Sequence, residues 1–537
     1  MAFGPNENGR PAVTLVRRRI AFAAVFCAAA FGIVGARLVD VMVLNGGASV
    51  ATARSAPAQQ HRADLVDRNG TLMARDLPVA DLYASPGSFW DVGEAAEALS
   101  EATGTDAARL REIFSSGRNH VLVQRSLTPD GRAAVMRLGL PGLTFEDRFK
   151  RYYPSGRIAA HAVGLADIDG NGVSGLELGL DDAVRGGEAP VVLSFDMRVQ
   201  YALQHEVART AAEFSAIAAG GVVLNVRTGE VLALVSLPDF EPNTRAAQPG
   251  DSTRNRMTQD IYELGSIFKI FAFAEAVEEE TIRLDEMIDV HTPLRFGRYS
   301  IGDFGEHGWA LPASMVFAES SNIGTAQIGM RSGPERQRAF LTRMGLLAPM
   351  KTEVPEIAAP LFPRRWGEIE TATVSYGHGI SVNPLSFVAA TATVVNGGTL
   401  VVPTFRAREF PQLGERVLSE RTSQTMRHLL RLVVTDGTGG KADVPGYDVG
   451  GKTGTAEKPA GRGYSRSRQI SSFIAVFPAS DPEYLVFTMF DEPKGTAASF
   501  GFATAGWTAA PATGRVIARI APLLGVSRHE TLAAAAP

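Results

Sequence analysis

Cysteine is almost absent from this chain of 537 residues, in which Cys27 is the single one. One cysteine allows no intrachain disulfide and no zinc site built from several cysteines. An excess of charge of one sign is also missing, because 53 Lys and Arg face 57 Asp and Glu, giving a formal net charge of −4. This balance excludes a general nucleic-acid binder, which would carry a basic excess.

Lysine is scarce as well. Of the 53 positively charged residues seven are lysines, which leaves 46 arginines. The chain uses arginine for ordinary surface charge, so each lysine becomes a candidate for chemistry, because lysine gives up its proton far more readily than arginine. The hydrophobic share of 45% and the charged share of 20% are typical of globular protein.

The N-terminal part predicts a membrane anchor. Residues 20–36 form an uncharged, mostly apolar run of 17 residues that follows Arg17, Arg18 and Arg19. At about 1.5 Å per residue this run just reaches the short limit for crossing a bilayer. The basic cluster is expected to stay in the cytoplasm, which places the long C-terminal part outside. A cleaved signal peptide is the alternative, but its candidate site at Ala51-Thr52-Ala53 lies far beyond the apolar run.

The chain is too long for one domain, and its composition changes along its length. A linker of small and polar residues is followed by mixed strands, turns and short helices, and then by a different, strongly apolar pattern. We predict a cytoplasmic tail over 1–19, a transmembrane anchor over 20–44, a linker over 45–60, a pedestal domain over 61–215, a catalytic domain over 216–528 and a disordered tail over 529–537.

The predicted fold class is α+β, with an elongated mixed α/β pedestal and a catalytic domain built on one sheet. Two strand-like runs flank the turn Arg227-Thr228-Gly229 as a hairpin, and three more come late in the chain. A long, mainly helical stretch separates the two sets, which suggests one five-stranded antiparallel sheet flanked by helices. The five runs cover 220–226, 230–236, 447–457, 470–477 and 484–491, and a last helix covers 504–524.

A serine and a lysine share one face of a predicted helix. From Ile267 to Ala274 every residue except Lys269 is apolar, and a helix that is apolar all round is buried. Burial disfavours the charged ammonium and lowers its pKa, which allows a neutral amine near pH 7. Ser266 lies one turn earlier at the helix start, and a hydroxyl beside such an amine is the arrangement of an activated nucleophile. The ordinary alternative is that Ser266 caps the helix and Lys269 snorkels to the surface.

A second lysine lies in a glycine-rich, strand-like run, Gly450-Gly451-Lys452-Thr453-Gly454-Thr455. Glycine weakens a strand unless another backbone must come close, so this run favours an edge that a peptide substrate joins by strand addition. Lys452 would supply positive charge, and the hydroxyls of Thr453 and Thr455 could bind a terminal carboxylate. A glycine-rich hairpin turn is the alternative.

The pattern Ser-x-Asn occurs twice, at Ser320-Ser321-Asn322 and at Ser381-Val382-Asn383, and by itself does not choose between them. Caps and turns are the ordinary role of both residue types. Chain order favours the first, because it gives Ser-x-x-Lys, then Ser-x-Asn, then Lys-Thr-Gly, which is the signature of serine penicillin-recognising enzymes.

On these motifs the chain resembles the class B penicillin-binding proteins, the D,D-transpeptidases that cross-link peptidoglycan, and most of all their division-specific FtsI type, penicillin-binding protein 3. The resemblance covers nearly everything after residue 60. Ala63 stands where glycine is usual in the first pedestal motif, and Leu264 where many relatives have proline. The segments that carry the resemblance are His61–Gly70, Arg151-Tyr152-Tyr153-Pro154, Gly175-Leu176-Glu177, Ser320–Gly324, Tyr376–Ile380, Asn396-Gly397-Gly398 and Ala505–Pro511.

The resemblance implies a mechanism. Ser266 attacks a stem peptide at its penultimate D-Ala, Lys269 accepts the proton, and Ser320 and Lys452 relay protons and position charge. Asn322 hydrogen-bonds the substrate, Thr453, Gly454 and Thr455 bind it, and the backbone N–H groups of Ser266 and Thr455 form the oxyanion hole. No metal or organic cofactor is implied, β-lactams should acylate Ser266, and His378 is expected to be structural.

The implied setting is the bacterial inner membrane at the division septum, with a single membrane pass, a cytoplasmic N-terminus and a periplasmic catalytic domain. The expected partners are glycan strands derived from lipid II, a SEDS glycosyltransferase of the FtsW kind and other membrane proteins of the division machinery. Alternatives are an elongation-specific class B transpeptidase, a non-catalytic division scaffold and a β-lactamase. The pedestal is expected to lift the active site off the membrane and to dock partners.

Overall fold

The structure is a computed structural model, and it describes residues 11–39, 61–244, 251–305, 307–411, 414–460 and 463–528. It divides into two compact units, Met1–Gln59 and Gln60–Pro537. The predicted linker over 45–60, the predicted tail over 529–537 and the first ten residues of the tail over 1–19 lie outside the described residues.

The first unit contains one described helix, α1 (Pro11–Val39). Within the described ranges, no helix combines the length and the apolar character that crossing a membrane requires. The predicted transmembrane anchor over 20–44 is therefore not borne out. Its uncharged run of 17 residues lies between Arg19 and Arg37, which is at the short limit of the length that a bilayer requires. Residues 40–44 lie outside the described residues.

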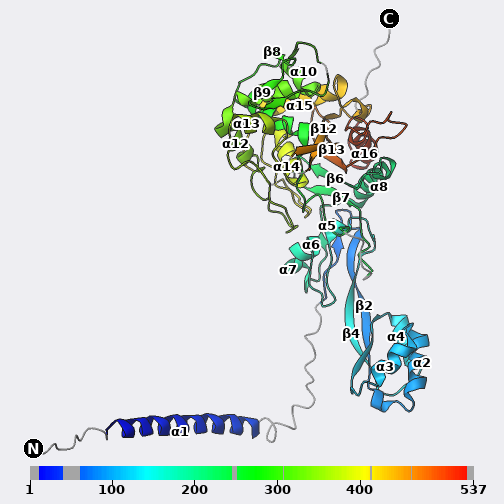
Figure 1. The fold of residues 1–537 in the computed structure, drawn as a ribbon. Coiled ribbons are helices and arrows are strands. Elements are labelled where there is room, and N and C mark those ends of the chain that lie inside the picture. Colours follow the sequence, from blue (N-terminus) through cyan, green and yellow to red (C-terminus); the bar gives the residue numbers. More distant parts are fainter. Residues whose placement is uncertain are drawn as a thin grey trace, which may run out of the picture. The chain divides into compact units, whose positions relative to one another are not determined.

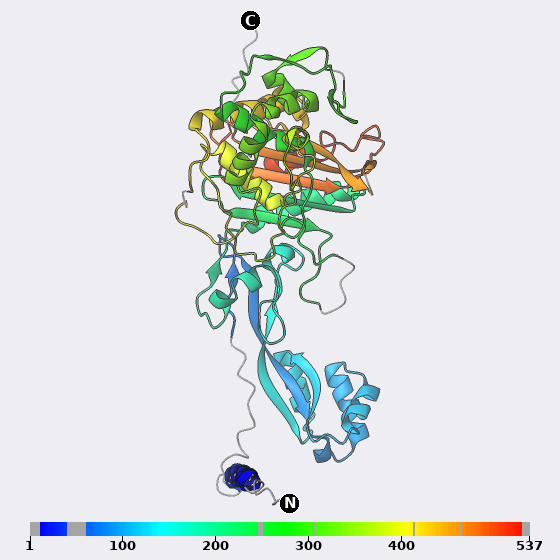
Figure 2. The same ribbon diagram turned by 60° about the vertical axis from the view of Figure 1, so that its left-hand side comes forward.

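The second unit begins with a mixed α/β part, as predicted for the pedestal. Its longest strand, β2 (Leu72–Ala84), pairs antiparallel with β4 (Leu143–Tyr152) and with β3 (Val121–Leu127). Next to β2, β1 (Leu65–Val66) pairs parallel with β5 (Val191–Val192). Figure 1 shows β2 and β4 side by side, and Figure 2 shows the same pair in blue and cyan leading to a group of helices.

These helices have the start signals that local sequence supplies. Asp91 and Asp106 accept hydrogen bonds from backbone N–H groups at the starts of two helices, and Thr128 does so before Pro129. A small core of leucine, valine and phenylalanine side chains fixes them on the sheet. The helical elements are η2 (Pro86–Ser88), α2 (Val92–Thr103), α3 (Ala107–Phe114), α4 (Pro129–Arg137), α5 (Ala160–Val163), α6 (Gly175–Gly179) and α7 (Asp181–Val184).

The catalytic part is built on the predicted antiparallel sheet with helices on both faces. Its strand order is β12-β13-β14-β6-β7, and every neighbouring pair is antiparallel. The predicted hairpin and late strands are confirmed, and one strand coincides with its predicted range of 484–491. The strands are β6 (Ala218–Asn225), β7 (Val231–Leu237), β12 (Gly450–Ala460), β13 (Gly463–Phe477) and β14 (Tyr484–Asp491).

Alternate side chains of the central strands enter two cores. Val223 and Val486 pack with α8 (Met197–Glu213) and α16 (Ala509–Leu523) on one face. Val222 and Phe487 pack on the other face with the helix that follows Ser266 and with its neighbours. This alternation is the period of a strand buried on both sides. In Figure 1, α8 and α16 lie together beside the sheet.

The stretch predicted as mainly helical holds the expected helices, but also two short strand pairs over 287–312. β9 pairs with β10 and β8 with β11, both antiparallel. Gly297, with a φ of +59°, makes the turn between β9 and β10, a conformation that glycine adopts without strain. The elements are β8 (Met287–Asp289), β9 (Leu294–Phe296), β10 (Tyr299–Ile301), β11 (Ala310–Pro312), η3 (Gly265–Phe268), α9 (Lys269–Glu278), α10 (Ala313–Ala318), α11 (Asn322–Met330), α12 (Gly333–Arg343), α13 (Glu368–Ser375), α14 (Pro384–Val395), α15 (Glu420–Thr435) and η4 (Gly440–Ala442).

Candidate active site

Ser266 lies where a short 3₁₀ turn, η3, leads into α9. The helical segment thus starts where the sequence predicts, although its first turn is tighter than an α-helix. The start of this segment touches the backbone of β12. A Cβ built on Gly454 would lie 2.7 Å from the carbonyl oxygen of Leu264, and one built on Gly265 would lie 3.1 Å from that of Thr455. These glycines allow the close approach that places Ser266 beside the glycine-rich strand.

Lys269 is 0% exposed, which confirms the predicted burial. Its Nζ donates to the Ser320 hydroxyl at 3.2 Å and also to the Ser320 carbonyl oxygen. Burial lowers the pKa of Lys269 well below its usual value, the nearby charge of Lys452 lowers it further, and the Asp303 carboxylate acts in the opposite direction. The lysine therefore loses its proton far more easily than one in water.

Lys452 on β12 is the second fully buried lysine of the site, also 0% exposed. Its Nζ donates to the Ser320 hydroxyl at 2.9 Å and to the Thr453 carbonyl oxygen at 3.3 Å. Burial lowers its pKa to about 7. The structure therefore brings the two predicted lysines, which are far apart in the sequence, to one hydroxyl.

Ser320 occupies the turn between α10 and α11. Its φ of +65° lies in the left-handed region, which costs a non-glycine residue free energy of about 1 kcal/mol or more. The following residue, Ser321, caps α11 by accepting a hydrogen bond from the Gly324 N–H at 3.0 Å. The strained turn is thus held in place, and it directs the Ser320 hydroxyl to both lysines.

The second Ser-x-Asn pattern has an ordinary structural role. Asn383 is buried and caps α14 by accepting hydrogen bonds from the N–H groups of Leu385 and Ser386. By contrast, Asn322 at the start of α11 is only partly buried, and its side-chain amide donates to the Gly302 carbonyl oxygen at a long 3.4 Å. Asn322 therefore keeps hydrogen-bonding capacity, whereas Asn383 is used within the fold.

Asp303 lies in this site, although no sequence pattern marks it. Its side chain is 5% exposed. It accepts hydrogen bonds from the Ser321 hydroxyl at 2.6 Å, from the Ile323 N–H at 3.1 Å and from the Asn322 N–H. A carboxylate at the start of α11 is stabilised by the free N–H groups there. It follows a short strand in a loop without a recognisable motif, so only the tertiary structure identifies it.

The threonines of β12 lie along the edge of the sheet, because β12 pairs only with β13 among the described strands. The Thr453 hydroxyl lies 2.7 Å from that of Thr438, and the Thr455 hydroxyl accepts a hydrogen bond from the Ala505 N–H at 3.2 Å. Both hydroxyls are thus oriented by neighbours outside the strand. An edge with oriented hydroxyls suits an extended peptide.

His378 contacts the side chains of Tyr464 and Glu263. Its ring stacks on Tyr464, with centroids 4.4 Å apart, and its Nε2 lies 3.8 Å from Glu263. Burial lowers the pKa of His378 and raises that of Glu263. These contacts fit the predicted structural role. Across the described ranges, His, Cys, Asp and Glu side chains form no cluster that could hold a metal ion.

Comparison with known proteins identifies two families. Residues 219–512 match the penicillin binding protein transpeptidase domain, and residues 57–198 match the penicillin-binding protein dimerisation domain. The chain is 44% identical over 487 residues to the probable peptidoglycan D,D-transpeptidase FtsI of Caulobacter vibrioides, covering 88% of this chain and 82% of that one. With the peptidoglycan D,D-transpeptidase FtsI of Escherichia coli K12 it shares 28% identity, covering 85% and 83%.

A solved structure has the same fold over most of the chain. Penicillin binding protein 3 from Mycobacterium tuberculosis, complexed with aztreonam, superposes with a TM-score of 0.69 at 26% identity. The superposition covers 88% of this chain and 98% of that one. The similarity thus includes both the pedestal and the catalytic part.

Proposed function

Because the chain belongs to the class B penicillin-binding proteins, we propose that it is a serine D,D-transpeptidase that cross-links peptidoglycan stem peptides through an acyl-enzyme during septal wall synthesis. One observation carries this proposal: Lys269, one turn after Ser266, is fully buried. Lys269 donates a hydrogen bond to the Ser320 hydroxyl, and Lys452 donates to the same hydroxyl. β-Lactams, which mimic the D-Ala-D-Ala end, acylate the same serine.

In the first step the Ser266 hydroxyl oxygen attacks the carbonyl carbon of the penultimate D-Ala. The neutral amine of Lys269 takes the hydroxyl proton during the attack. The serine therefore becomes a strong nucleophile without carrying a buried negative charge before the reaction. The low pKa of Lys269 supports this role, because an amine that is protonated at working pH would accept nothing. The bond from the carbonyl carbon to the terminal D-Ala nitrogen then breaks, leaving an ester on Ser266.

The departing D-Ala nitrogen needs a proton, and the Ser320 hydroxyl is placed to deliver it. This hydroxyl lies within hydrogen-bond distance of both lysine nitrogens, at 3.2 Å for Lys269 and 2.9 Å for Lys452. A proton taken up by Lys269 can thus move to Ser320 and out to the leaving group, with Lys452 supplying the balancing charge. The left-handed turn at Ser320 fixes this geometry before substrate arrives.

The substrate peptide binds as an additional strand along β12. Thr453 and Thr455 present hydroxyls to its terminal carboxylate, and Asn322 reaches its backbone from the opposite wall. The backbone N–H groups of Ser266 and Thr455 stabilise the negative oxygen of the tetrahedral intermediate. The contacts of Gly265 and Gly454 support this pairing, because they hold the two backbones together.

In the second step an amine from another stem peptide attacks the ester carbon and releases Ser266, with the proton path reversed. These steps use only side-chain and backbone groups of the chain, and the proposal includes no metal or organic cofactor. The glycan strands that carry the stem peptides derive from lipid II, and we propose that a SEDS glycosyltransferase of the FtsW kind supplies them together with other division proteins.

We further propose that the protein acts at the bacterial inner membrane at the septum, attached through its N-terminal part, with a cytoplasmic N-terminus and the catalytic part in the periplasm. The FtsI names of relatives and the basic residues Arg17–Arg19 before an apolar run support this placement. Depletion should then give filamentous cells with the protein at midcell; rounded cells would favour the elongation-specific alternative. Protease treatment of spheroplasts should remove the catalytic part and spare an N-terminal tag.

Mass spectrometry with benzylpenicillin tests the enzymatic proposal. The full chain should carry one penicilloyl adduct, on the peptide that contains Ser266, and Ser266→Ala should carry none. Ser381→Ala, which changes the serine of the other Ser-x-Asn pattern, should label like the wild type. An adduct on another residue, or rapid turnover of nitrocefin as expected for a β-lactamase, would contradict it.

A further inference from the structure

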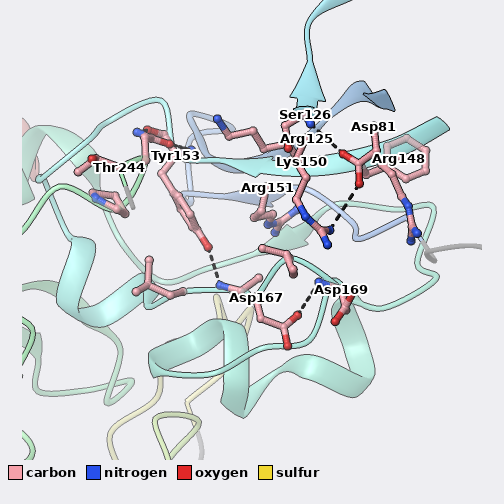
Figure 3. A pocket seen from close by; sticks show the side chains of 16 residues that line it. Asp81, Arg125, Ser126, Arg148, Lys150, Arg151, Tyr153, Asp167, Asp169 and Thr244 are labelled. Atoms are coloured by element: carbon pink, nitrogen blue, oxygen red, sulfur yellow. Dashed lines mark hydrogen bonds and ion pairs between the residues drawn. The ribbon is translucent and has the colours of Figure 1, made fainter. Parts of the chain in front are cut away.

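The pedestal contains a pocket that the transpeptidase reaction does not use. It has a volume of about 310 Å³ and lies where β3 and β4 face the loop over 165–169 and the residues just after β7 (Figure 3). Its wall therefore joins pedestal residues to Pro242, Asn243 and Thr244 of the catalytic part. A ligand bound here contacts both parts of the chain.

The wall of this pocket carries four cationic and three acidic side chains, which leaves one positive charge. Two of the acids are already used within the protein. Asp81 accepts a hydrogen bond from the Ser126 N–H at 2.8 Å, and Asp167 accepts from the N–H groups of Asp169 and Asn171 at 2.9 Å and 2.8 Å. The seven charged residues are Arg125, Arg148, Lys150, Arg151, Asp81, Asp167 and Asp169.

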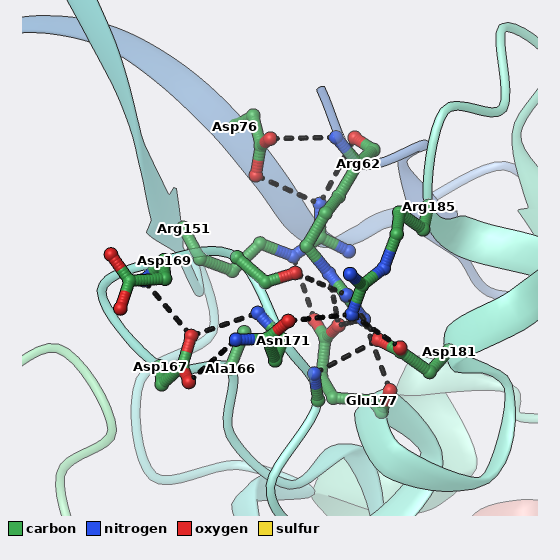
Figure 4. Close-up of polar contacts among 12 residues, drawn as sticks. Arg62, Asp76, Arg151, Ala166, Asp167, Asp169, Asn171, Glu177, Asp181 and Arg185 are labelled. Atoms are coloured by element: carbon green, nitrogen blue, oxygen red, sulfur yellow. Dashed lines mark hydrogen bonds and ion pairs between the residues drawn. The ribbon is translucent and has the colours of Figure 1, made fainter. Parts of the chain in front are cut away.

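One of the cations is buried and incompletely bonded. The Arg151 side chain is 4% exposed, and it donates from Nε to Glu177 at 2.7 Å and from Nη1 to Asp76 at 3.2 Å (Figure 4). Its Nη2 is also buried, but it has no hydrogen-bond partner within the described ranges. A buried charged donor without a partner loses the hydrogen bonds that water would give it, which is unfavourable. Such a donor in the wall of a pocket indicates a missing acceptor.

A neutral donor lies beside it. The Tyr153 hydroxyl oxygen accepts a hydrogen bond from the Ala166 N–H at 2.9 Å. Among the described residues the hydroxyl proton has no acceptor. Tyr153 is 5% exposed, and burial raises its pKa far above the usual value, so the proton stays in place at neutral pH. The exposed Lys150 adds a cation at the solvent side, and it forms no ion pair with the residues that the structure describes.

We propose that this pocket binds a carboxylate, with Arg151 and Lys150 as the charged donors and the Tyr153 hydroxyl as the neutral one. Planar guanidinium and carboxylate groups match in geometry. Arg125, Arg148 and Arg151 are paired with carboxylates of the protein, which leaves the charge of Lys150 available to a monoanion. A phosphate dianion would be repelled by the three acids. The carboxylate belongs either to a free small acid or to an acidic side chain of a peptide, and this inference does not rest on the transpeptidase activity.

Calorimetric titration of the full chain tests the proposal with four probes: sodium acetate, acetyl-Gly-Glu-Gly-amide, acetyl-Gly-Gln-Gly-amide and inorganic phosphate. We expect one site that takes the Glu peptide and rejects the Gln peptide. If acetate binds as tightly as the Glu peptide, a free small acid is sufficient as the ligand. If acetate binds more weakly, the ligand is the acidic side chain of a peptide. Both outcomes support a carboxylate site.

Variants locate the site. Lys150→Gln and Tyr153→Phe should each weaken binding of the Glu peptide at least about fivefold, while Lys351→Gln, at an exposed lysine elsewhere, should leave it unchanged. Circular dichroism melting curves confirm that each variant is folded. Equal binding of the Glu and Gln peptides, tighter binding of phosphate than of acetate, absence of any binding, or wild-type affinity in Lys150→Gln would overturn the proposal.

Discussion

Lys269 and Lys452 donate to the same hydroxyl, that of Ser320, at 3.2 Å and 2.9 Å. Both lysines are 0% exposed, and the charge of Lys452 lowers the pKa of Lys269. Two buried ammonium groups around one oxygen repel each other, so the pair releases one proton easily. The site thereby holds a base and a cation together, and several predictions test this.

The rate of acylation by a fluorescent penicillin should rise with pH as Lys269 loses its proton. In Lys452→Met the rising limb should move to higher pH, because removing a like charge raises the pKa of Lys269. Second-order rate constants of acylation, measured between pH 5.5 and 9, locate this rise in rate. A limb that stays in place or moves to lower pH in this variant would show that the two amines are not coupled.

Lys269→Arg should lower the acylation rate by about 100- to 10,000-fold, the usual contribution of a general base. Arginine keeps the positive charge but does not give up its proton at working pH. Lys351→Arg makes the same change at an exposed lysine and should acylate like the wild type. If Lys269→Arg acylates at a rate within tenfold of the wild type, Lys269 is not the general base.

Asp303→Asn should shift the same pH profile in the opposite direction. Loss of the carboxylate charge lowers the pKa of Lys269, so the limb moves to lower pH. The variant also loses an acceptor for the Ser321 hydroxyl and should reduce the free energy of unfolding by about 1–3 kcal/mol. Asp285→Asn, at an exposed carboxylate, is the control for urea unfolding and acylation. A shift to higher pH would contradict the proposed electrostatics.

Gly454→Ala should slow acylation at least about tenfold, because displacing reacting groups by up to about 1 Å lowers the reaction rate strongly. The new methyl group would lie 2.7 Å from the Leu264 carbonyl oxygen and 2.6 Å from the Ser472 hydroxyl, which forces β12 away from η3. Gly463→Ala is the matched control in the neighbouring strand, where a Cβ meets nothing within 4 Å. Equal acylation rates in the two variants would refute the need for this close approach.

Glu177→Gln should destabilise the pedestal strongly. Glu177 is 0% exposed and forms ion pairs with Arg62 at 2.6 Å and with Arg151 at 2.7 Å (Figure 4). Removing its charge leaves two buried arginines without one of their negative partners, which should lower the free energy of unfolding by about 3–5 kcal/mol. Urea unfolding measures the loss, with Asp182→Asn at an exposed neighbouring carboxylate as the control. A loss no larger than that of the control would mean that the network does not hold the pedestal together.

The sequence predicted those features that depend on local patterns. The hairpin about Arg227-Thr228-Gly229 and the strand over 484–491 follow from turn chemistry and apolar runs, and the apolar surround of Lys269 gave its burial. The choice of Ser320 over Ser381 needed the resemblance to a family, because both have the same local pattern. The structure gives the physical difference, since Asn383 is used as a helix cap.

Features that depend on tertiary contacts could not be predicted from the sequence. Asp303 lies in a loop without a motif, and its role comes from the distant start of α11. The unpartnered nitrogen of Arg151 follows from how two strands and a loop pack, which no spacing reveals. The membrane anchor over 20–44 was predicted from an apolar run at the short limit of length, and the described helix does not meet the requirement.

The most direct test of the central claim is the pKa of Lys269 itself. With only seven lysines in the chain, lysine labelled with ¹³C at Cε gives few signals, and Lys269→Arg assigns the one of interest. Our account predicts a Cε signal that titrates well below the usual pKa of about 10.4, with the amine neutral over part of the working pH range. Titration at the usual value, with the ammonium charged throughout that range, would contradict it.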